Sequence, residues 1–282
     1  MDRMLRRGTA IGAVGVGLLM TIGVYTAATG AGLTCAGRWP LCDGLFGLFP
    51  ANWASFIEWF HRLVAVVVGL WLIGLTALAF RRDAPRLLRG ALVVAVVLLP
   101  TQIVLGALTV REYAVVILLA HFVTATGIFT ASAVAAAVAN RRWLTAHPRV
   151  HMLGPAVAVV PMLLLTPHLL VAFTPAVQVG YYLSGLTAVG LTVAGVVTAS
   201  TWDRTRIARA GAALVLALLL VVGRLVFSTP RAVSVLGVPL PAGLLLVAVA
   251  FAAPVVYTVD GVVGTGVLLA LGVSAVYVVV RK

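Results

Sequence analysis

Residues 56–80 read FIEWFHRLVAVVVGLWLIGLTALAF and are followed directly by Arg81 and Arg82. Every titratable side chain of this segment lies in its first third, and the remainder is apolar apart from two glycines and one threonine. About 20 consecutive apolar residues are enough for a helix to cross the hydrocarbon core of a bilayer. The segment therefore predicts a membrane-spanning helix that begins with polar groups and ends with basic ones.

The composition extends this interpretation to the whole chain of 282 residues. Hydrophobic residues make up 62% and charged residues 10%, with a mean hydropathy of +1.16, whereas about 25% of the residues of a soluble domain are charged. These values exclude a soluble enzyme and a disordered chain. Asp260 and Gly261 precede the last long apolar segment and leave open whether the chain has eight or nine helices. The apolar segments are residues 9–30, 56–80, 90–110, 114–139, 152–173, 177–200, 208–227, 238–258 and 262–280.

Arginines determine the expected orientation of the chain. Four clusters, at residues 3–7, 81–89, 141–149 and 204–209, lie before or between apolar segments. Because basic loops stay on the cytoplasmic side of a membrane, we expect a multi-pass protein of the cell membrane with a cytoplasmic N-terminus and an external loop at residues 31–55. The clusters form no single basic face, so the net charge of +13 does not indicate nucleic acid as a partner. The expected partner of these segments is the lipid bilayer.

The two halves of the chain resemble each other weakly. EWFHRL (58–63) opens the second apolar segment, and QVGYYL (178–183) opens the sixth; LGAL (105–108) and VGRL (222–225) end the third and seventh. Similar motifs at a nearly constant offset indicate an internal repeat. We predict an all-α fold, a polytopic membrane helix bundle with two four-helix halves in a degenerate tandem repeat, divided into domains 1–140 and 141–282.

Polar side chains gather at one depth in the first half. Glu58 and His61 are three residues apart and share a helix face, while Gln102 and His121 lie on the third and fourth segments. At 1.5 Å per residue, His61 lies roughly 8 Å, His121 roughly 10 Å and Gln102 roughly 12 Å from the outer end of its helix. Two imidazoles that face each other across a bundle are what a six-coordinate haem iron requires. A carboxylate beside them can take up a proton or stabilise a developing cation.

Each of these residues also has a purely structural interpretation. His61 could pair with Arg62 and anchor the helix end at the interface, and His121 could bond to a backbone carbonyl. Arg62 is expected to extend toward the outer headgroups, because long basic side chains carry their charge to water. The shared depth and the neighbouring carboxylate favour haem ligation over these alternatives.

Cys35 and Cys42 lie together in the external loop. On the oxidising face of a membrane, two cysteines this close in sequence indicate a disulfide that closes a small loop. A redox-active pair and two free thiols remain alternatives. A zinc site is disfavoured, because only two sulfurs are present and no third ligand lies nearby.

Four ordered motifs carry a resemblance to a known family: the loop 30–44, EWFHR (58–62), QIVLGALTV (102–110) and HF (121–122). Together they resemble the N-terminal half of haem A synthase, an eight-helix membrane oxidoreductase that converts the C8 methyl of haem O to the formyl of haem A. The resemblance implies that His61 and His121 bind the haem iron, that Gln102 belongs to the haem-binding site, and that Glu58 is catalytic. It also implies that the two cysteines match an external pair that serves the fold or the passage of electrons.

The second half departs from the family pattern, in which another histidine pair holds haem b. The position that corresponds to His61 holds Tyr181, and the position that corresponds to His121 falls near Val238. We therefore expect residues 141–282 to be a scaffold without haem. The remaining candidates for a ligand there are Tyr181 and His168, since His147 and His151 lie at the cytoplasmic side.

The expected function is thus that of a membrane oxidoreductase resembling haem A synthase. The alternatives are a b-type cytochrome that only transfers electrons, and a haem carrier or assembly factor that does not change its ligand. The expected cofactor is haem with its iron, with haem O as substrate and haem b compatible with the fold. The expected partners are haem O synthase, an electron acceptor that the sequence does not identify, and a second copy of the chain, since a homo-oligomer is compatible with the sequence.

Overall fold

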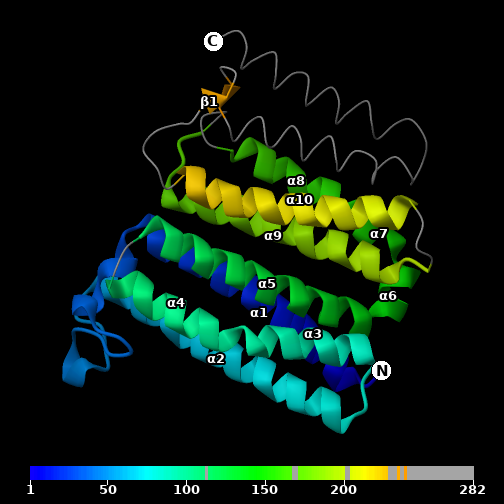
Figure 1. Cartoon of the computed structure of the whole chain (residues 1–282), viewed down its shortest axis with the longest axis horizontal. Coiled ribbons are helices and arrows are strands. Elements are labelled where there is room, and N and C mark those ends of the chain that lie inside the picture. The colour runs from blue at the N-terminus through cyan, green and yellow to red at the C-terminus, as the bar shows by residue number, and fades with distance from the viewer. Residues whose placement is uncertain (112–113, 167–170, 201–203, 228–233, 236–237, 240–282) are drawn as a thin grey trace. The chain divides into compact units, whose positions relative to one another are not determined.

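The computed structural model describes residues 1–111, 114–166, 171–200, 204–227, 234–235 and 238–239 (Figure 1). These residues form helices and one short antiparallel pair of strands, β1 (Ser234–Val235) and β2 (Val238–Pro239). Six helices in the described part are long and apolar enough to cross a membrane. The predicted class, a polytopic helical bundle, is therefore confirmed. Apart from β2, the predicted spans 238–258 and 262–280 lie outside the described residues.

The chain divides into two compact units, the first of which comprises Met1–Asn140 with Thr174–Val179. Its helices are α1 (Arg3–Ala28), α2 (Trp53–Arg81), α3 (Arg86–Val97), α4 (Leu99–Arg111) and α5 (Val115–Ala139). α1 packs against α2 and α5, and α3 packs against the same two helices, so these form a closed four-helix arrangement. α4 continues the course of α3 and packs against α5.

Side-chain caps set the beginnings of the first two helices. The Asp2 carboxylate accepts a hydrogen bond from the Met4 backbone N–H at 3.2 Å, and the Asn52 side chain accepts one from the Ser55 N–H at 3.0 Å. Such caps satisfy backbone donors that a helix leaves unpaired at its start. The break between α3 and α4 falls at Leu98, two residues before Pro100. A proline has no N–H to donate and its ring crowds the preceding turn, which explains the break.

The main core cluster of the first unit lies at the end where α1 begins and α2 ends. Leu5, Leu75, Leu88 and Leu92 are almost fully buried and belong to one cluster. Gly8 of α1 lets α2 approach closely, and the Trp71 indole donates a hydrogen bond to the Gly8 carbonyl at 3.0 Å. Small residues at a helix contact are typical of membrane bundles, in which close packing replaces the hydrophobic effect.

One face of α2 remains exposed along its whole length. Trp53, Phe60, Leu63, Val67 and Leu70 are all exposed and recur three, four or seven residues apart, the spacing of a single helix face. An exposed apolar face is expected of a helix that borders lipid, and aromatic residues at its end are typical of the membrane interface. We refer to these five residues below as the α2 stripe.

The second unit comprises Arg141–Phe173 and Gly180–Lys282. Its described helices are α6 (Arg141–Ala146), α7 (Pro148–Met152), α8 (Gly154–Leu164), most of α9 (Pro175–Thr198) and α10 (Arg204–Phe227). The predicted single span at 152–173 is wrong in its extent, because α8 ends at Leu164. Pro161 removes one helical hydrogen bond, and Thr166 precedes Pro167, a position at which the helical conformation is disfavoured.

Candidate functional site

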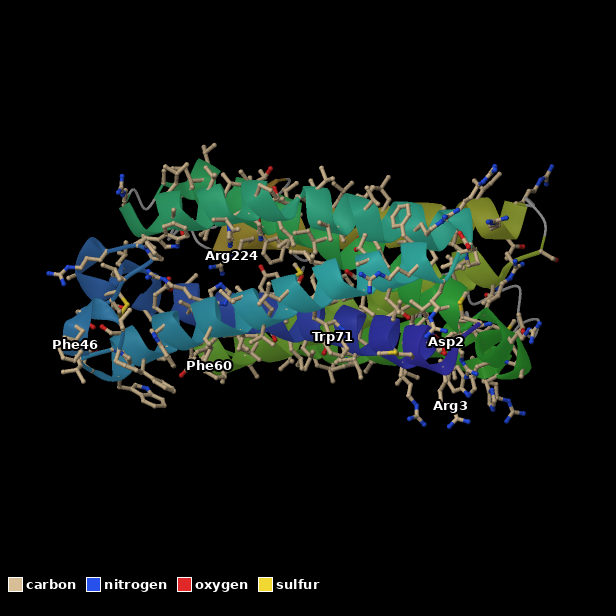
Figure 2. The ribbon with its side chains drawn as sticks, turned by 90° about the horizontal axis from the view of Figure 1, so that it is seen from below. Asp2, Arg3, Phe46, Phe60, Trp71 and Arg224 are labelled. Carbon is tan, nitrogen blue, oxygen red and sulfur yellow. A yellow bond between two sulfur atoms is a disulfide. The ribbon has the colours of Figure 1, made fainter. Side chains whose placement is uncertain are left out.

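A disulfide closes the loop that joins α1 to α2. Cys35 and Cys42 are bonded to each other, and both are buried. Figure 2 shows this loop, marked by Phe46, at one end of the first unit and Asp2 and Arg3 at the other. The Trp59 indole donates a hydrogen bond to the Leu48 carbonyl at 2.8 Å, so the loop is also tied to α2.

Asp43 ties the same loop to the first turn of α2. One carboxylate oxygen of Asp43 accepts from the Ser55 hydroxyl at 2.6 Å, and the other accepts from the Ala51 N–H at 2.9 Å. These two hydrogen bonds hold the pKa of Asp43 below its ordinary value, because they stabilise the ionised form. The hydrogen bond from Ser55 has the larger effect on this pKa. Sequence reasoning missed Asp43, since an acidic residue beside a cysteine is no signal of such a contact.

Glu58 and Arg62 form an ion pair one helical turn apart on α2. The Arg62 Nε donates to Glu58 Oε1 at 2.8 Å, and the Glu58 residue is only 5% exposed. Arg62 Nη1 donates to the backbone carbonyls of Leu41 at 2.9 Å and of Arg38 at 3.1 Å. The expectation that Arg62 extends toward headgroups is therefore wrong: its guanidinium turns to the loop, where Nη1 donates to carbonyl oxygens.

The two histidines of the first unit each lie against a glycine of a neighbouring helix. A Cβ atom added at Gly23 of α1 would lie 2.9 Å from His61 Cε1, and one added at Gly106 of α4 would lie 3.3 Å from His121 Cε1. His61 thus lies at the contact of α1 with α2, and His121 lies at the contact of α4 with α5, both inside the first unit.

Polar atoms at this place lack partners within the part of the chain that the structure describes. His61 Nδ1, His121 Nδ1 and Gln102 Oε1 are buried and make no hydrogen bond there. The predicted alternative, a His121 bonded to a backbone carbonyl, is not what the described residues show. A buried polar atom without a partner costs about 1–3 kcal/mol, and in a membrane bundle such atoms indicate a ligand site. Two imidazoles from facing helices are a donor set that fits haem iron.

Tyr181, the predicted counterpart of His61, lies in the second unit in contact with other aromatic side chains. Tyr181 and Tyr182 are buried on α9, with ring centroids 5.2 Å apart, and Phe173 packs edge-on against Tyr181 at 5.9 Å. His147 stacks on Trp143 at 4.8 Å. The other candidates among the histidines are separate from this group: His151 is buried in α7, and His168 lies outside the described residues. The absence of haem from this unit stays a prediction.

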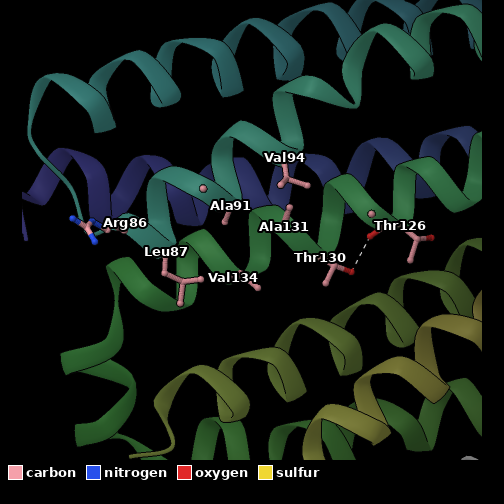
Figure 3. Close-up of a pocket in the computed structure, with 10 residues that line it drawn as sticks. Arg86, Leu87, Ala91, Val94, Thr126, Thr130, Ala131 and Val134 are labelled. Carbon is pink, nitrogen blue, oxygen red and sulfur yellow. Dashed lines mark hydrogen bonds between the residues drawn. The ribbon is translucent and has the colours of Figure 1, made fainter.

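A groove of about 760 Å³ lies between α3 and α5 of the first unit (Figure 3). Its walls are mostly apolar, and the Thr130 hydroxyl in it donates to the Thr126 carbonyl of its own helix at 2.8 Å. At about 100° per residue, Thr130 lies on the opposite side of α5 from His121. The groove is therefore not part of the histidine site.

Known proteins resemble parts of this chain. A protohaem IX farnesyltransferase of Haloarcula marismortui is 37% identical over 117 residues, which are 42% of this chain and 25% of that protein. A haem A synthase of Bacillus pumilus is 37% identical over 91 residues, 31% of this chain and 29% of that protein. A haem A synthase of Bacillus licheniformis is 34% identical over 106 residues, 34% of each chain. No family model and no solved structure matches the sequence.

The chain spans about a quarter to a third of the length of these curated relatives. The predicted resemblance to haem A synthase is confirmed over that part of the chain. The farnesyltransferase relatives, like the haem A synthases, carry the name of an enzyme that acts on haem. The chain is thus a multi-pass helical membrane protein that resembles membrane enzymes of haem biosynthesis.

Proposed function

We propose that the protein is an oxidoreductase of the haem A synthase type, which oxidises the C8 methyl of haem O to the formyl of haem A. The observation that carries this proposal is the cluster formed by His61, His121 and Glu58. Both histidines have a buried Nδ1 without a hydrogen-bond partner in the described part of the chain, and Glu58 is a buried carboxylate one turn before His61 on α2. The partial similarity to haem A synthases supports the same assignment.

Each residue has a distinct part in this proposal. His61 and His121 bind the iron of haem O, the substrate, and so fix the height and tilt of its ring. Glu58 accepts the proton that is released as water adds at the oxidised methyl, or stabilises the positive charge that develops there. Gln102, with an unpartnered buried Oε1, lines the same site. The conversion of the methyl to the formyl takes its oxygen from one water molecule and releases four protons and four electrons, and the electrons leave to a separate electron acceptor. We propose that the end with the Cys35–Cys42 loop faces outward.

The rival function is that of a b-type cytochrome that transfers electrons without changing its haem. One observation favours it: Glu58 is paired with Arg62, a contact that serves the fold without any catalytic role.

The similarity to farnesyltransferases supports haem O synthase as the proposed supplier of substrate.

Haem extraction with mass analysis tests the proposal. The protein is expressed alongside a source of haem O, purified, and its bound haem is extracted. The proposal expects haem A in the parent protein, and retained haem O with no haem A in Glu58→Gln, which keeps the shape of the side chain but removes the base. Haem O that stays unchanged in the parent, or haem A formed at the parent rate in Glu58→Gln, would overturn it.

A further inference from the structure

We propose that Arg62 is a positioning residue: it holds the Glu58 carboxylate against the disulfide-closed loop, so that the loop and the carboxylate act as one unit. This inference rests on the proposed catalytic role of Glu58. Arg62 itself is not placed at the reacting atoms, and acts through Glu58.

The guanidinium of Arg62 makes contacts in two directions. Its Nε donates to Glu58 Oε1 at 2.8 Å, and its Nη1 donates to the Leu41 and Arg38 carbonyls at 2.9 and 3.1 Å. The side chains of Arg62 and Glu58 are only 15% and 7% exposed. Because a guanidinium is planar and its N–H directions are fixed relative to one another, the position of the carbonyls fixes the position of the carboxylate.

The carbonyls that Arg62 contacts are themselves held in place. Arg38 and Leu41 lie between the two cysteines, so the disulfide closes the loop around them. The loop is further tied to the first turn of α2 by the Asp43–Ser55 hydrogen bond. The carbonyls, the guanidinium and the beginning of α2 therefore form one connected frame around Glu58.

This arrangement leaves one carboxylate oxygen for chemistry. Oε1 of Glu58 is occupied by Arg62, while Oε2 accepts no hydrogen bond from the residues that the structure describes and lies beside Gly32, where an added Cβ would be 3.9 Å away. A carboxylate held by one oxygen presents the other in a fixed direction. Misplacement of a reacting group by about 1 Å can cost about a hundredfold in rate, so loss of Arg62 is expected to slow turnover on that scale.

The test compares Arg62→Gln and Arg62→Lys with Glu58→Gln. The control is Arg111→Gln, which removes an exposed arginine at the end of α4 with no described contact to Glu58. Three quantities are measured on the purified full chain: the optical spectrum of bound haem, haem A formed per bound haem, and the rate at which a thiol reagent reduces Cys35–Cys42. The first reports the histidines, the second turnover, and the third the order of the loop.

The inference expects Arg62→Gln to keep the parent haem spectrum, to lose about a hundredfold in haem A per bound haem, and to undergo faster reduction of the disulfide. The double variant Glu58→Gln/Arg62→Gln should lose no more turnover than Glu58→Gln alone, because both residues act through one carboxylate. Arg62→Lys, which keeps the charge, should recover part of the turnover, and Arg111→Gln should resemble the parent.

Two results separate this inference from the function on which it rests. Parent-rate turnover in Glu58→Gln overturns the proposed function. Loss of turnover in Glu58→Gln together with parent-rate turnover and parent-rate disulfide reduction in Arg62→Gln overturns only the inference. If Arg62→Gln does not accumulate, Arg62→Lys decides: parent values of both turnover and disulfide reduction in that variant overturn the positioning role.

Discussion

Replacement of Gly23 by alanine tests the position of His61 without touching a candidate ligand. The new Cβ would lie 2.9 Å from His61 Cε1, whereas ordinary van der Waals contact begins at 3.4 Å. The imidazole must therefore move by at least 3.4 − 2.9 = 0.5 Å, or α1 must move away from α2. Overpacking of this kind costs about 1–3 kcal/mol. The gain in helix propensity from Gly to Ala, up to about 1 kcal/mol, offsets part of that cost. A change in stability alone therefore does not show whether His61 has moved.

The optical and electron paramagnetic resonance spectra of bound haem are the sharper assay. If His61 ligates the iron, a displacement of about half an ångström weakens that bond and raises the high-spin fraction in Gly23→Ala. Gly106→Ala, with its contact at 3.3 Å to His121, should show a smaller change. Gly15→Ala is the matched control on α1, because its Cβ would meet Val68 at an ordinary 3.5 Å. A parent spectrum with parent haem content in Gly23→Ala would refute the reasoning that the contact with Gly23 sets the position of His61 at the iron.

Three further predictions concern the same unit. Replacement of His61 or His121 by alanine should abolish the low-spin haem spectrum or convert it to high spin; an unchanged spectrum in both variants would remove the haem assignment. Intact-mass analysis should show that Cys35 and Cys42 react with an alkylating reagent only after reduction, and alkylation of both thiols without reductant would contradict the disulfide. Because the pKa of Asp43 is lowered in the folded protein, its contribution to stability is present above the ordinary aspartate pKa of about 3.9 and is lost as the pH falls through the lowered value. The difference in thermal unfolding between the parent and Asp43→Asn should therefore disappear at strongly acidic pH, and a difference that persists there would contradict this reasoning.

The bounds of α2 show how closely the apolar pattern of a sequence predicts the extent of a helix. The run at residues 56–80 predicted the span closely, and the structure extends it to Trp53–Arg81. The three additional residues at its start come from the Asn52 cap, a local hydrogen bond that hydropathy does not register. Likewise, the predicted span at 90–110 is in the structure two helices, because Pro100 interrupts an otherwise uniform apolar run.

Contacts between distant residues account for what the sequence could not predict. Helix geometry predicts a shared level for His61 and His121, since rise per residue and direction of crossing are general properties, and that level stays a prediction. The turn of Arg62 toward the loop did not follow, because it depends on where the Leu41 carbonyl lies after the loop has closed. The Ser55–Asp43 hydrogen bond was missed for the same reason.

Helix α2 is longer than a bilayer is thick. Its 29 residues extend over about 44 Å, whereas the hydrocarbon core measures about 30 Å. Such an excess is accommodated by tilt, by protrusion or by local thickening of the bilayer. The α2 stripe begins with Trp53, whose ring prefers the headgroup level, so that end resists being drawn inward and the excess falls on the Arg81 end. Glu58 and His61 then lie about one to two turns below the headgroups. The Trp53 anchor thus sets how far both side chains lie from bulk water, and a change in lipid chain length is taken up at the Arg81 end of α2 and not at the site.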